Sequence, residues 1–206
     1  ITEPGTGSDS ANICTTAVAD GDAWVLNGAK IYVTDGQRSD TLVVWATLDK
    51  SLGKAAIKSF IVEKGTPGCE VIRLEHKLGI RASDTASISF NDCRIPKANI
   101  LGSPDIATDA EGRKKAFGGV MQTFDNTRPP VAAMAIGVSR AALDLSRALL
   151  KEGGVELKFD KKPANLSAIE AELAQMEAEW HGARLLVLKA AWMADNKMPN
   201  SMEASM

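Results

Sequence analysis

Trp24-Val25-Leu26-Asn27-Gly28-Ala29-Lys30-Ile31-Tyr32-Val33-Thr34 is the stretch that decides the fold of the first half of the chain. Two strand-like apolar runs, residues 24–26 and 31–34, flank the dipeptide Asn27-Gly28. Both residues of an Asn-Gly pair accept positive φ, so this dipeptide between two such runs is a strong short-range signal for a β-hairpin. We therefore expect an antiparallel hairpin that turns at Asn27-Gly28.

Similar short apolar runs, separated by turn residues, continue to about Ile100. The further runs are Thr41-Leu42-Val43-Val44-Trp45, Ser59-Phe60-Ile61-Val62, Val71-Ile72 and Ser87-Ile88-Ser89-Phe90. The spacers include Asp35-Gly36, Thr66-Pro67-Gly68 and Asn91-Asp92. Many short strands at this spacing predict an antiparallel barrel-like or sandwich domain, here over residues 1–104.

After about Asp105 the apolar period becomes helical. One stripe at i, i+3, i+4 and i+7 spacing comprises Val131, Met134, Ala135, Val138, Ala142, Leu145 and Leu149. A second stripe begins at a capping-box pattern, Ser167 with Glu170, and comprises Ile169, Leu173, Met176, Trp180, Val187 and Ala191. We expect both stripes to face a core, Gly153-Gly154 to form the loop between the helices, and residues 105–206 to form part of an antiparallel helical bundle. The predicted fold class is α+β.

Pro129-Pro130 interrupts the first helical stretch, which otherwise begins near Glu111. Proline removes a backbone donor and clashes with the preceding turn, so a kink or break is expected there. A loop between two helices is an equally good interpretation of the same residues.

Composition excludes several classes of protein. The chain has 206 residues, a formal net charge of -2 and 24% charged residues, which argues against a nucleic-acid binder. No apolar run approaches the roughly 18 residues of a membrane helix, so a soluble protein of the cytoplasm, or of the mitochondrial matrix in a eukaryote, is expected. Three cysteines without a CxxC pair and two histidines predict no metal site. The start at Ile1 and the helical composition at Met206 suggest an internal piece of a longer polypeptide.

Thr2-Glu3-Pro4-Gly5-Thr6-Gly7-Ser8-Asp9 precedes the first strand and is rich in glycine and hydroxyl groups. Glycine lets backbone N–H groups approach a ligand closely, and hydroxyls can donate to ring heteroatoms or phosphates. Many surface loops share this composition, so the segment indicates a binding site only together with other motifs.

Four motifs together resemble the acyl-CoA dehydrogenase family, in its medium-chain-like form, in order and approximate spacing. They are Thr2-Glu3-Pro4-Gly5-Thr6-Gly7-Ser8-Asp9, Asn27-Gly28-Ala29-Lys30-Ile31-Tyr32-Val33-Thr34-Asp35-Gly36, Leu78-Gly79-Ile80-Arg81-Ala82-Ser83-Asp84-Thr85 and Phe124-Asp125-Asn126-Thr127-Arg128-Pro129. The resemblance covers nearly the whole chain and implies a flavin- and acyl-CoA-binding middle domain followed by an incomplete helical domain.

The resemblance implies FAD as cofactor, and it assigns residues to it. Thr34 would donate its hydroxyl toward flavin N5, and Thr2 would bond the pyrimidine edge. Tyr32 stands where the family usually has tryptophan, and it keeps a flat aromatic face. The complete implied cofactor set is Ile1, Thr2, Gly7, Ser8, Tyr32, Val33 and Thr34.

The resemblance also implies the substrate and the reaction. The implied CoA-thioester contacts are Ser8, Asp125, Asn126, Thr127 and Arg128; an Asp suits amide N–H groups and an Arg suits phosphate oxygens. A carboxylate would remove the α-proton while the β-hydride passes to flavin N5, giving a trans-2-enoyl-CoA, as in fatty-acid β-oxidation. An electron-transfer flavoprotein would accept the electrons, and the enzyme would be a homo- or hetero-oligomer, a dimer or tetramer.

Two segments depart from the family pattern. Thr127 occupies the place where isovaleryl-type members carry the catalytic glutamate, so this chain contains no catalytic base, and the base is expected after Met206. Glu156 and Asp160 stand where an RxxFG segment would supply an arginine and a glycine, and Lys158 or Lys161 are the candidate substitutes. An active dehydrogenase, a non-catalytic or half-catalytic subunit of a hetero-oligomer, and an acyl-CoA oxidase therefore stay open.

Overall fold

A computed structural model describes residues 1–107, 109, 112, 118–160 and 162–206. It divides into two compact units, Ile1–Gly119 and Val120–Met206. The expected helix start near Glu111 lies outside the described residues. The assignment of residues 1–104 to flavin and acyl-CoA binding and of residues 105–206 to an incomplete bundle stays a prediction.

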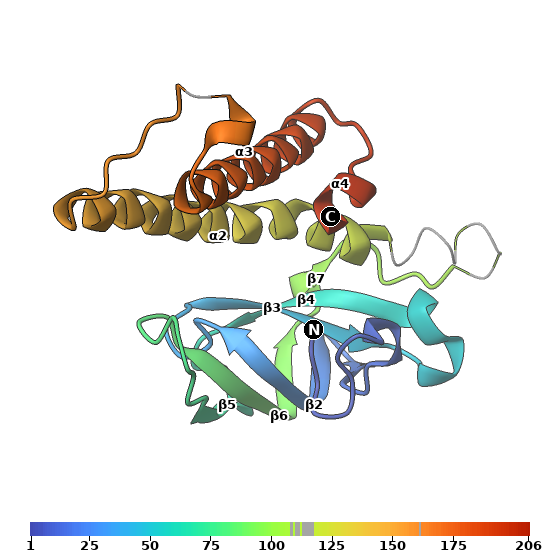
Figure 1. The fold of residues 1–206 in the computed structure, drawn as a ribbon. Coiled ribbons are helices and arrows are strands. Elements are labelled where there is room, and N and C mark those ends of the chain that lie inside the picture. The colour runs from blue at the N-terminus through green and yellow to red at the C-terminus, as the bar shows by residue number, and fades with distance from the viewer. Residues whose placement is uncertain (108, 110–111, 113–117, 161) are drawn as a thin grey trace. The chain divides into compact units, whose positions relative to one another are not determined.

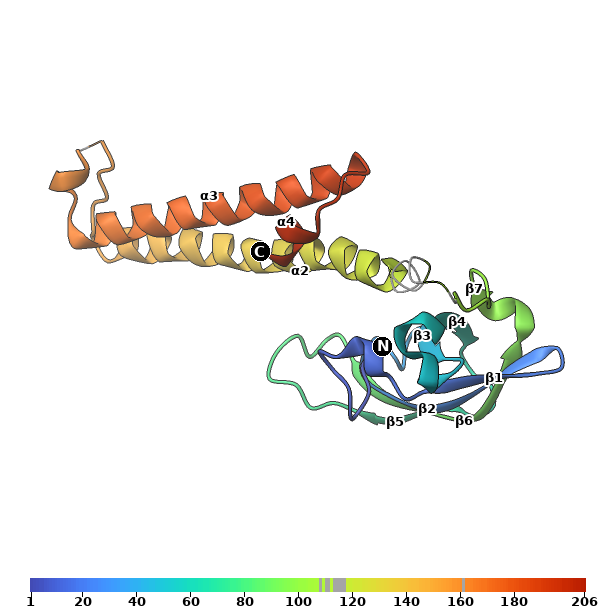
Figure 2. The same ribbon diagram turned by 90° about the vertical axis from the view of Figure 1, so that its right-hand side faces the viewer.

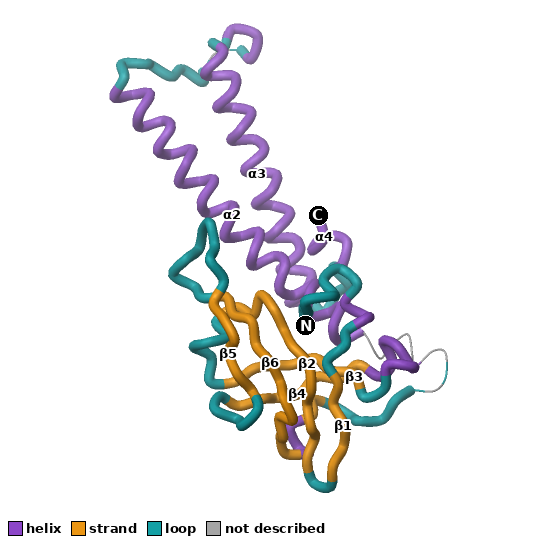
Figure 3. Tube along the Cα trace, turned by 90° about the horizontal axis from the view of Figure 1, so that it is seen from below, coloured by secondary structure: helices purple, strands orange, loops and turns teal. Residues whose placement is uncertain are grey.

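The first unit is a seven-stranded sheet in the order β5-β6-β2-β1-β3-β4-β7, most of which can be followed in Figure 3. The strands are β1 (Thr16–Asp20), β2 (Ala23–Thr34), β3 (Thr41–Thr47), β4 (Ile57–Glu63), β5 (Cys69–Leu74), β6 (Thr85–Pro96) and β7 (Ile100–Leu101). Three 3-10 helices, η1 (Ser10–Asn12), η2 (Lys50–Ala56) and η3 (Lys97–Asn99), lie in the connections. Every apolar run predicted as a strand lies within a strand.

The expectation of a purely antiparallel sheet is wrong at one pair. β1 and β3 are joined in parallel through Thr16 and Thr47, and the other neighbours are antiparallel. This single parallel bridge makes the sheet mixed, because the chain enters β1 and β3 from the same end.

The sheet curves around one apolar core without closing. Trp24 on β2 packs edge-on against Phe60 on β4, with ring centroids 5.5 Å apart, although β1 and β3 separate these strands in the sheet. Leu26, Ile88 and Phe90 complete the centre of this core. In the described residues the strand order begins at β5 and ends at the two-residue β7, so the predicted barrel is an open curved sheet.

The predicted hairpin at Asn27-Gly28 is wrong, because β2 runs through both residues. Its register with β6 shifts between Leu26 and Gly28, which marks a β-bulge. The actual two-residue hairpin turn follows Asp20, where Gly21 has a φ of 61°. A dipeptide that accepts positive φ suits a bulge as well as a turn, and the pairing with β6 decides between them.

The spacer predicted at Asn91-Asp92 is also inside a strand. Asp92, with a φ of 46°, lies opposite the β2 bulge. Its backbone N–H donates to the Asn27 side-chain oxygen at 2.8 Å, and the Asn27 amide donates to the Asp92 carboxylate at 3.1 Å. Asn27 and Asp92, the residues at which the β2–β6 pairing is irregular, therefore supply hydrogen-bond partners to one another across the two strands.

The second unit is an antiparallel pair of long helices, α2 (Gly118–Glu152) and α3 (Ala168–Asp195), followed by the short α4 (Ser201–Ser205) (Figures 1 and 2). A 3-10 turn, η4 (Pro163–Asn165), precedes α3. The predicted capping box at Ser167 and Glu170 is confirmed. The predicted loop at Gly153-Gly154 is confirmed, and Gly154 has a φ of 77°. α2 continues through Pro129 and Pro130, so the loop interpretation of that dipeptide is wrong.

The expectation that both apolar stripes face a core is wrong for much of α2. Val131, Val138 and Leu145 are exposed, with Val138 at 72%, whereas Leu143 on another face of the helix is buried. Leu173 of the α3 stripe is buried, but Met176 is exposed. Two helices side by side cover only one face of each other, which leaves the second face of α2 without a partner among the described residues.

Candidate functional site

A buried ion pair fixes the N-terminal segment to β2. The Lys30 ammonium lies 2.7 Å from a Glu3 carboxylate oxygen, and the two side chains are only 3% and 4% exposed. Glu3 also accepts from the backbone N–H groups of Cys14 and Thr15. The carbonyl of Thr2 accepts from the Ile31 N–H at 2.9 Å, so the first residues run beside β2.

Electrostatics of this pair follow from its burial and its hydrogen bonds. Burial acts to raise the pKa of Glu3, but hydrogen bonds from Lys30 and Thr15 outweigh it and the pKa lies below its ordinary value. Burial lowers the pKa of Lys30 by more than the bond to Glu3 raises it. Sequence reasoning missed the pair, because the residues are 27 positions apart and neither belongs to a local pattern that requires the other.

Three of the predicted cofactor residues line one pocket of about 240 Å³: Ile1, Val33 and Thr34. Lys30 lines it as well, so one member of the buried pair forms part of its wall. The remaining lining residues, from β3 and β6 and the segment before β3, are Ser39, Thr41, Leu42, Val43, Val44, Ile88 and Phe90. The pocket therefore combines an apolar floor with several hydroxyl groups.

Tyr32 lies at a second bulge of β2. Lys30 pairs with Ile88 on β6 and Val33 pairs with Ala86, so the register shifts between these two pairs. Ile31 and Tyr32 therefore both lie opposite the single residue Ser87. Tyr32 has a φ of 57° and is 64% exposed. The bulge thus turns an aromatic ring outward beside the pocket-lining Val33 and Thr34.

The glycine-rich loop closes on itself and stays open to solvent at its tip. Glu3 and Thr6 exchange backbone hydrogen bonds of 2.9 and 3.1 Å around the exposed Gly5. A Cβ added at Gly5 or at Gly7 would meet nothing within 4 Å. Packing of the described residues therefore gives no reason for glycine at these two positions. Gly7 and Ser8 are exposed and do not line the pocket.

The predicted thioester residues lie on α2, and the structure pairs two of them. Arg128 Nη1 is 3.3 Å from an Asp125 carboxylate oxygen, and Arg128 lies over the Phe124 ring. Asn126 is exposed, and the Thr127 hydroxyl donates to the Phe124 carbonyl of its own helix. Asp125 and Arg128 therefore form an ion pair, and neither the Asn126 nor the Thr127 side chain bonds to it.

Two serines of α4 bond to this ion pair. The Ser201 hydroxyl donates to the second Asp125 oxygen, and Arg128 Nη1 donates to the Ser205 hydroxyl at 3.2 Å. Sequence reasoning missed both serines. They lie 76 and 77 positions from their partners and carry no motif of their own.

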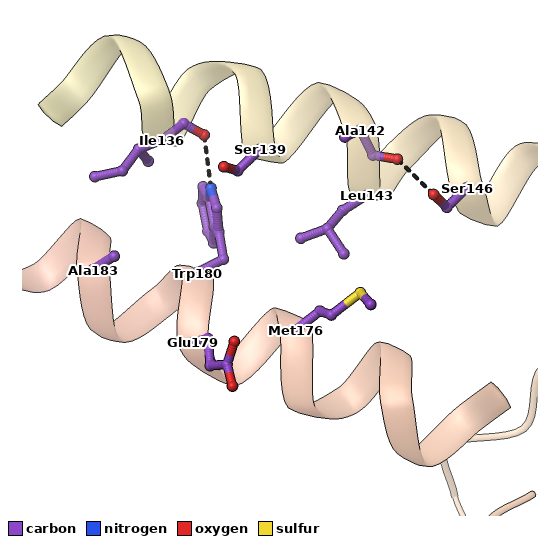
Figure 4. A pocket seen from close by; sticks show the side chains of 9 residues that line it. All are labelled: Ile136, Ser139, Ala142, Leu143, Ser146, Met176, Glu179, Trp180 and Ala183. Carbon is purple, nitrogen blue, oxygen red and sulfur yellow. Dashed lines mark hydrogen bonds between the residues drawn. The ribbon is translucent and has the colours of Figure 1, made fainter. Parts of the chain in front are cut away.

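A cavity of about 420 Å³ lies in the seam between α2 and α3 (Figure 4). Trp180 reaches across this seam, and its indole N–H donates to the Ile136 carbonyl at 2.9 Å. The residues that line this cavity include none of the predicted cofactor or thioester residues. The cavity is thus a feature of helix packing, separate from the candidate site.

Glu156 follows α2 and carries an exposed carboxylate. Lys158 Nζ lies 3.0 Å from it, and both side chains are largely open to solvent. The backbone N–H of Lys158 donates to the buried Glu170. Lys161, the other candidate substitute for the missing arginine, lies outside the described residues.

No helix among the described residues has both the length and the apolar character needed to cross a bilayer. In the same residues, no group of three or more His, Cys, Asp or Glu side chains is arranged to hold a metal ion.

Comparison with known proteins gives matches along the chain. Residues 1–93 match the family model of the acyl-CoA dehydrogenase middle domain, and residues 117–206 match that of the acyl-CoA dehydrogenase C-terminal domain. The mitochondrial short-chain specific acyl-CoA dehydrogenase of Bos taurus is 40% identical over 206 residues, which is all of this chain and 47% of that protein.

Two solved structures share the fold and much of the sequence. Butyryl-CoA dehydrogenase from Megasphaera elsdenii has a TM-score of 0.84 and 35% identity, over 98% of this chain and 50% of that one. A chain in a structure described as the electron transferring flavoprotein of Acidaminococcus fermentans has a TM-score of 0.85 and 38% identity, over 100% of this chain and 51% of that one. The chain spans about half the length of the curated relatives it matches. The two family models in consecutive order, together with this fold, show that the chain belongs to the acyl-CoA dehydrogenase family.

Proposed function

We propose that the complete protein carrying this chain is an FAD-dependent acyl-CoA dehydrogenase that converts an acyl-CoA thioester to a trans-2-enoyl-CoA. The observation that carries the proposal is the pocket of about 240 Å³, in which Ile1, Val33 and Thr34 come together from two segments of the chain. Val33 and Thr34 belong to one of the motifs that the family resemblance assigns to the flavin, and Ile1 directly precedes another.

The residues present fit a flavin. Thr34 offers a hydroxyl at the pocket, and the exposed ring of Tyr32 offers a flat surface for a fused ring system. Gly5 and Gly7 leave open backbone, which allows N–H groups to approach a ligand closely. When bound, FAD supplies the acceptor for the β-hydride.

The residues of this chain would bind and orient rather than remove the proton. Thr2 and Thr34 would hold the ring system, and Ser8 would reach the thioester. On α2, Asp125 and Arg128 would accept from an amide N–H and donate to a phosphate oxygen, respectively. The Thr127 hydroxyl has no carboxylate chemistry and donates within its own helix. The proposal therefore assigns the base to another part of the complete protein.

The substrate class and the partner follow from the relatives. The cattle relative is named short-chain specific and the Megasphaera relative is a butyryl-CoA dehydrogenase, which favours a short acyl chain. The likeness to a chain of an electron transferring flavoprotein structure favours such a flavoprotein as electron acceptor. Assembly as a homo- or hetero-oligomer is part of the same proposal.

Anaerobic titration with butyryl-CoA tests the proposal. The complete protein, loaded with FAD, should lose its visible flavin absorbance as butyryl-CoA is added, and crotonyl-CoA should appear in equal amount. A flavin spectrum that stays unchanged with short and long acyl-CoA thioesters would contradict a dehydrogenase.

A second candidate function is a non-catalytic or half-catalytic subunit of a hetero-oligomer. The observation that favours it is the exposed carboxylate of Glu156, with Lys158 as its only ion-pair partner among the described residues. A carboxylate repels a diphosphate, whereas the expected arginine would bind it. Co-purification with a second family member that alone binds flavin would support this candidate.

A further inference from the structure

Three side-chain contacts and one contact to a backbone carbonyl join two residues of α2 and two of α4 in a closed ring. The Ser201 hydroxyl donates to Asp125, the Asp125 carboxylate pairs with Arg128, and Arg128 Nη1 donates to the Ser205 hydroxyl. The ring is completed by the Ser205 hydroxyl, which donates to the Ser201 carbonyl at 2.6 Å. Each member of the α2 ion pair thus touches one serine, and the two serines are one helical turn apart.

Contacts other than these hydroxyls hold α4 in place. The amide of the buried Asn200 donates to the Ala190 carbonyl at 3.0 Å. Lys189 on α3 lies 3.0 Å from the Glu203 carboxylate, and Ala204 is buried. Removal of one serine hydroxyl should therefore leave α4 docked on the helix pair.

The ring leaves part of Arg128 available. Among the described residues both of its hydrogen bonds use Nη1, and the side chain is 48% exposed. The Nε and Nη2 groups can therefore meet a ligand while Nη1 is held. Fixing a long side chain before binding lowers the conformational entropy lost when a ligand arrives.

We propose that Ser201 and Ser205 are positioning residues for the CoA portion of the thioester, acting through Asp125 and Arg128. The inference rests on the proposed function. Ser205 orients the guanidinium that would meet a phosphate, and Ser201 orients the carboxylate that would accept from a pantetheine amide. The two serines therefore act on chemically different parts of one substrate.

Shortening the substrate separates the two roles. The complete FAD-loaded protein is assayed with butyryl-CoA and with S-butyryl-pantetheine, which has no phosphate. Ser205→Ala should raise KM and the calorimetric Kd for butyryl-CoA about tenfold, with little change in kcat and no change for the pantetheine thioester. Ser201→Ala should raise both constants for both thioesters.

Two further variants distinguish positioning from a general effect on folding. Ser205→Thr keeps the hydroxyl and should restore the affinity for butyryl-CoA. Ser146→Ala is the matched control, because that hydroxyl donates only to the Ala142 carbonyl of its own helix, and it should change neither constant.

Several outcomes would overturn the inference. Unchanged KM and Kd in both alanine variants of an active enzyme would do so. Equal losses of affinity for both thioesters in Ser205→Ala, which Ser205→Thr fails to restore, would do so as well. If the wild type binds butyryl-CoA without oxidising it, the dehydrogenase proposal fails, and the shift in Kd still decides the role of the serines. If no thioester binds, both fail.

Discussion

Lys30 and Glu3 form an ion pair of 2.7 Å in the interior of the β unit, with both side chains almost fully buried. The pair ties the glycine-rich segment to the strand that carries Tyr32 and Thr34. Removing one partner of a buried pair leaves the other charge uncompensated, which costs far more than the pair contributes over an apolar replacement. The pair is therefore a weak contributor to net stability and a strong constraint on where the first residues lie.

Glu3→Gln should destabilise the protein by about 3–5 kcal/mol at neutral pH, because it leaves the Lys30 ammonium buried without its counter-charge. Chemical denaturation of the complete protein measures this change. Asp20→Asn is the control, since Asp20 pairs with Arg94 at the surface and should change stability little. An unfolding free energy that Glu3→Gln leaves unchanged would show that the pair is not formed.

Stability should also depend on pH through Glu3. Because its folded pKa lies below the ordinary value, its ionisation contributes stability that is fully present above the unfolded pKa, about 4.3. That contribution is lost as the pH falls through the folded pKa. The stability difference between wild type and Glu3→Gln should thus shrink below a pH of about 4. Melting temperatures measured across this range check the sign, and a difference that grows in acid would refute it.

Gly28→Ala should destabilise the β unit by about 1–3 kcal/mol. Gly28 has a φ of 147°, and an added Cβ would lie 2.6 Å from the Thr15 hydroxyl oxygen and 2.7 Å from the Thr15 Cα. Two causes contribute to this loss, the positive φ and the steric clash with Thr15. Gly21→Ala separates them, because Gly21 has a φ of 61° but open space around it. A smaller loss for Gly21→Ala than for Gly28→Ala is the expected result, measured by thermal unfolding.

Thr34→Val should keep the fold and slow flavin reduction, by about 10²–10³-fold if its hydroxyl is a single preorganised donor to flavin N5. Stopped-flow reduction of the FAD-loaded protein by butyryl-CoA measures the effect. Thr41→Val is matched in size and lines the same pocket from β3, and it should reduce at the wild-type rate. A wild-type rate for Thr34→Val would remove Thr34 from the reacting centre.

Glu156→Arg should raise the affinity for FAD by about 10–100-fold, which is the effect of one charge-assisted bond to a phosphate. The protein purified alone should then carry more bound FAD. The wild type should retain FAD poorly, and a partner subunit that supplies an arginine should restore binding. Glu152→Arg, at the end of α2, is the control for added positive charge. Stoichiometric and tightly held FAD in the unmodified protein would instead assign the phosphate contact to Lys158 or Lys161.

Local patterns were predicted well from the sequence, because the groups involved lie close along the chain. Ser167 and Glu170 form the capping box that their spacing of three residues predicts. The chain from Thr41 onward forms β3, as its β-branched run predicts. Ile1, Val33 and Thr34, which the family resemblance assigns to one ligand, line one pocket.

Partners that are distant along the chain could not be predicted in this way. Asn27-Gly28 is a bulge rather than a turn because of what β6 places opposite it, including Asp92. Periodicity identified an apolar face around Val138, but burial depends on what packs against a face, and Val138 is exposed.

By itself, the sequence determined that a strand-rich half precedes a helical half, that Ser167 caps a helix, and the family, because propensity, capping and motifs act within a few residues. Only the tertiary structure decided that Glu3 meets Lys30, and that Ser201 and Ser205 meet Asp125 and Arg128. Those contacts join groups that are 27, 76 and 77 positions apart. The sequence around a charged group or a hydroxyl does not indicate which distant residue it will bond. Many different folds of the chain could bring a suitable partner within hydrogen-bond distance.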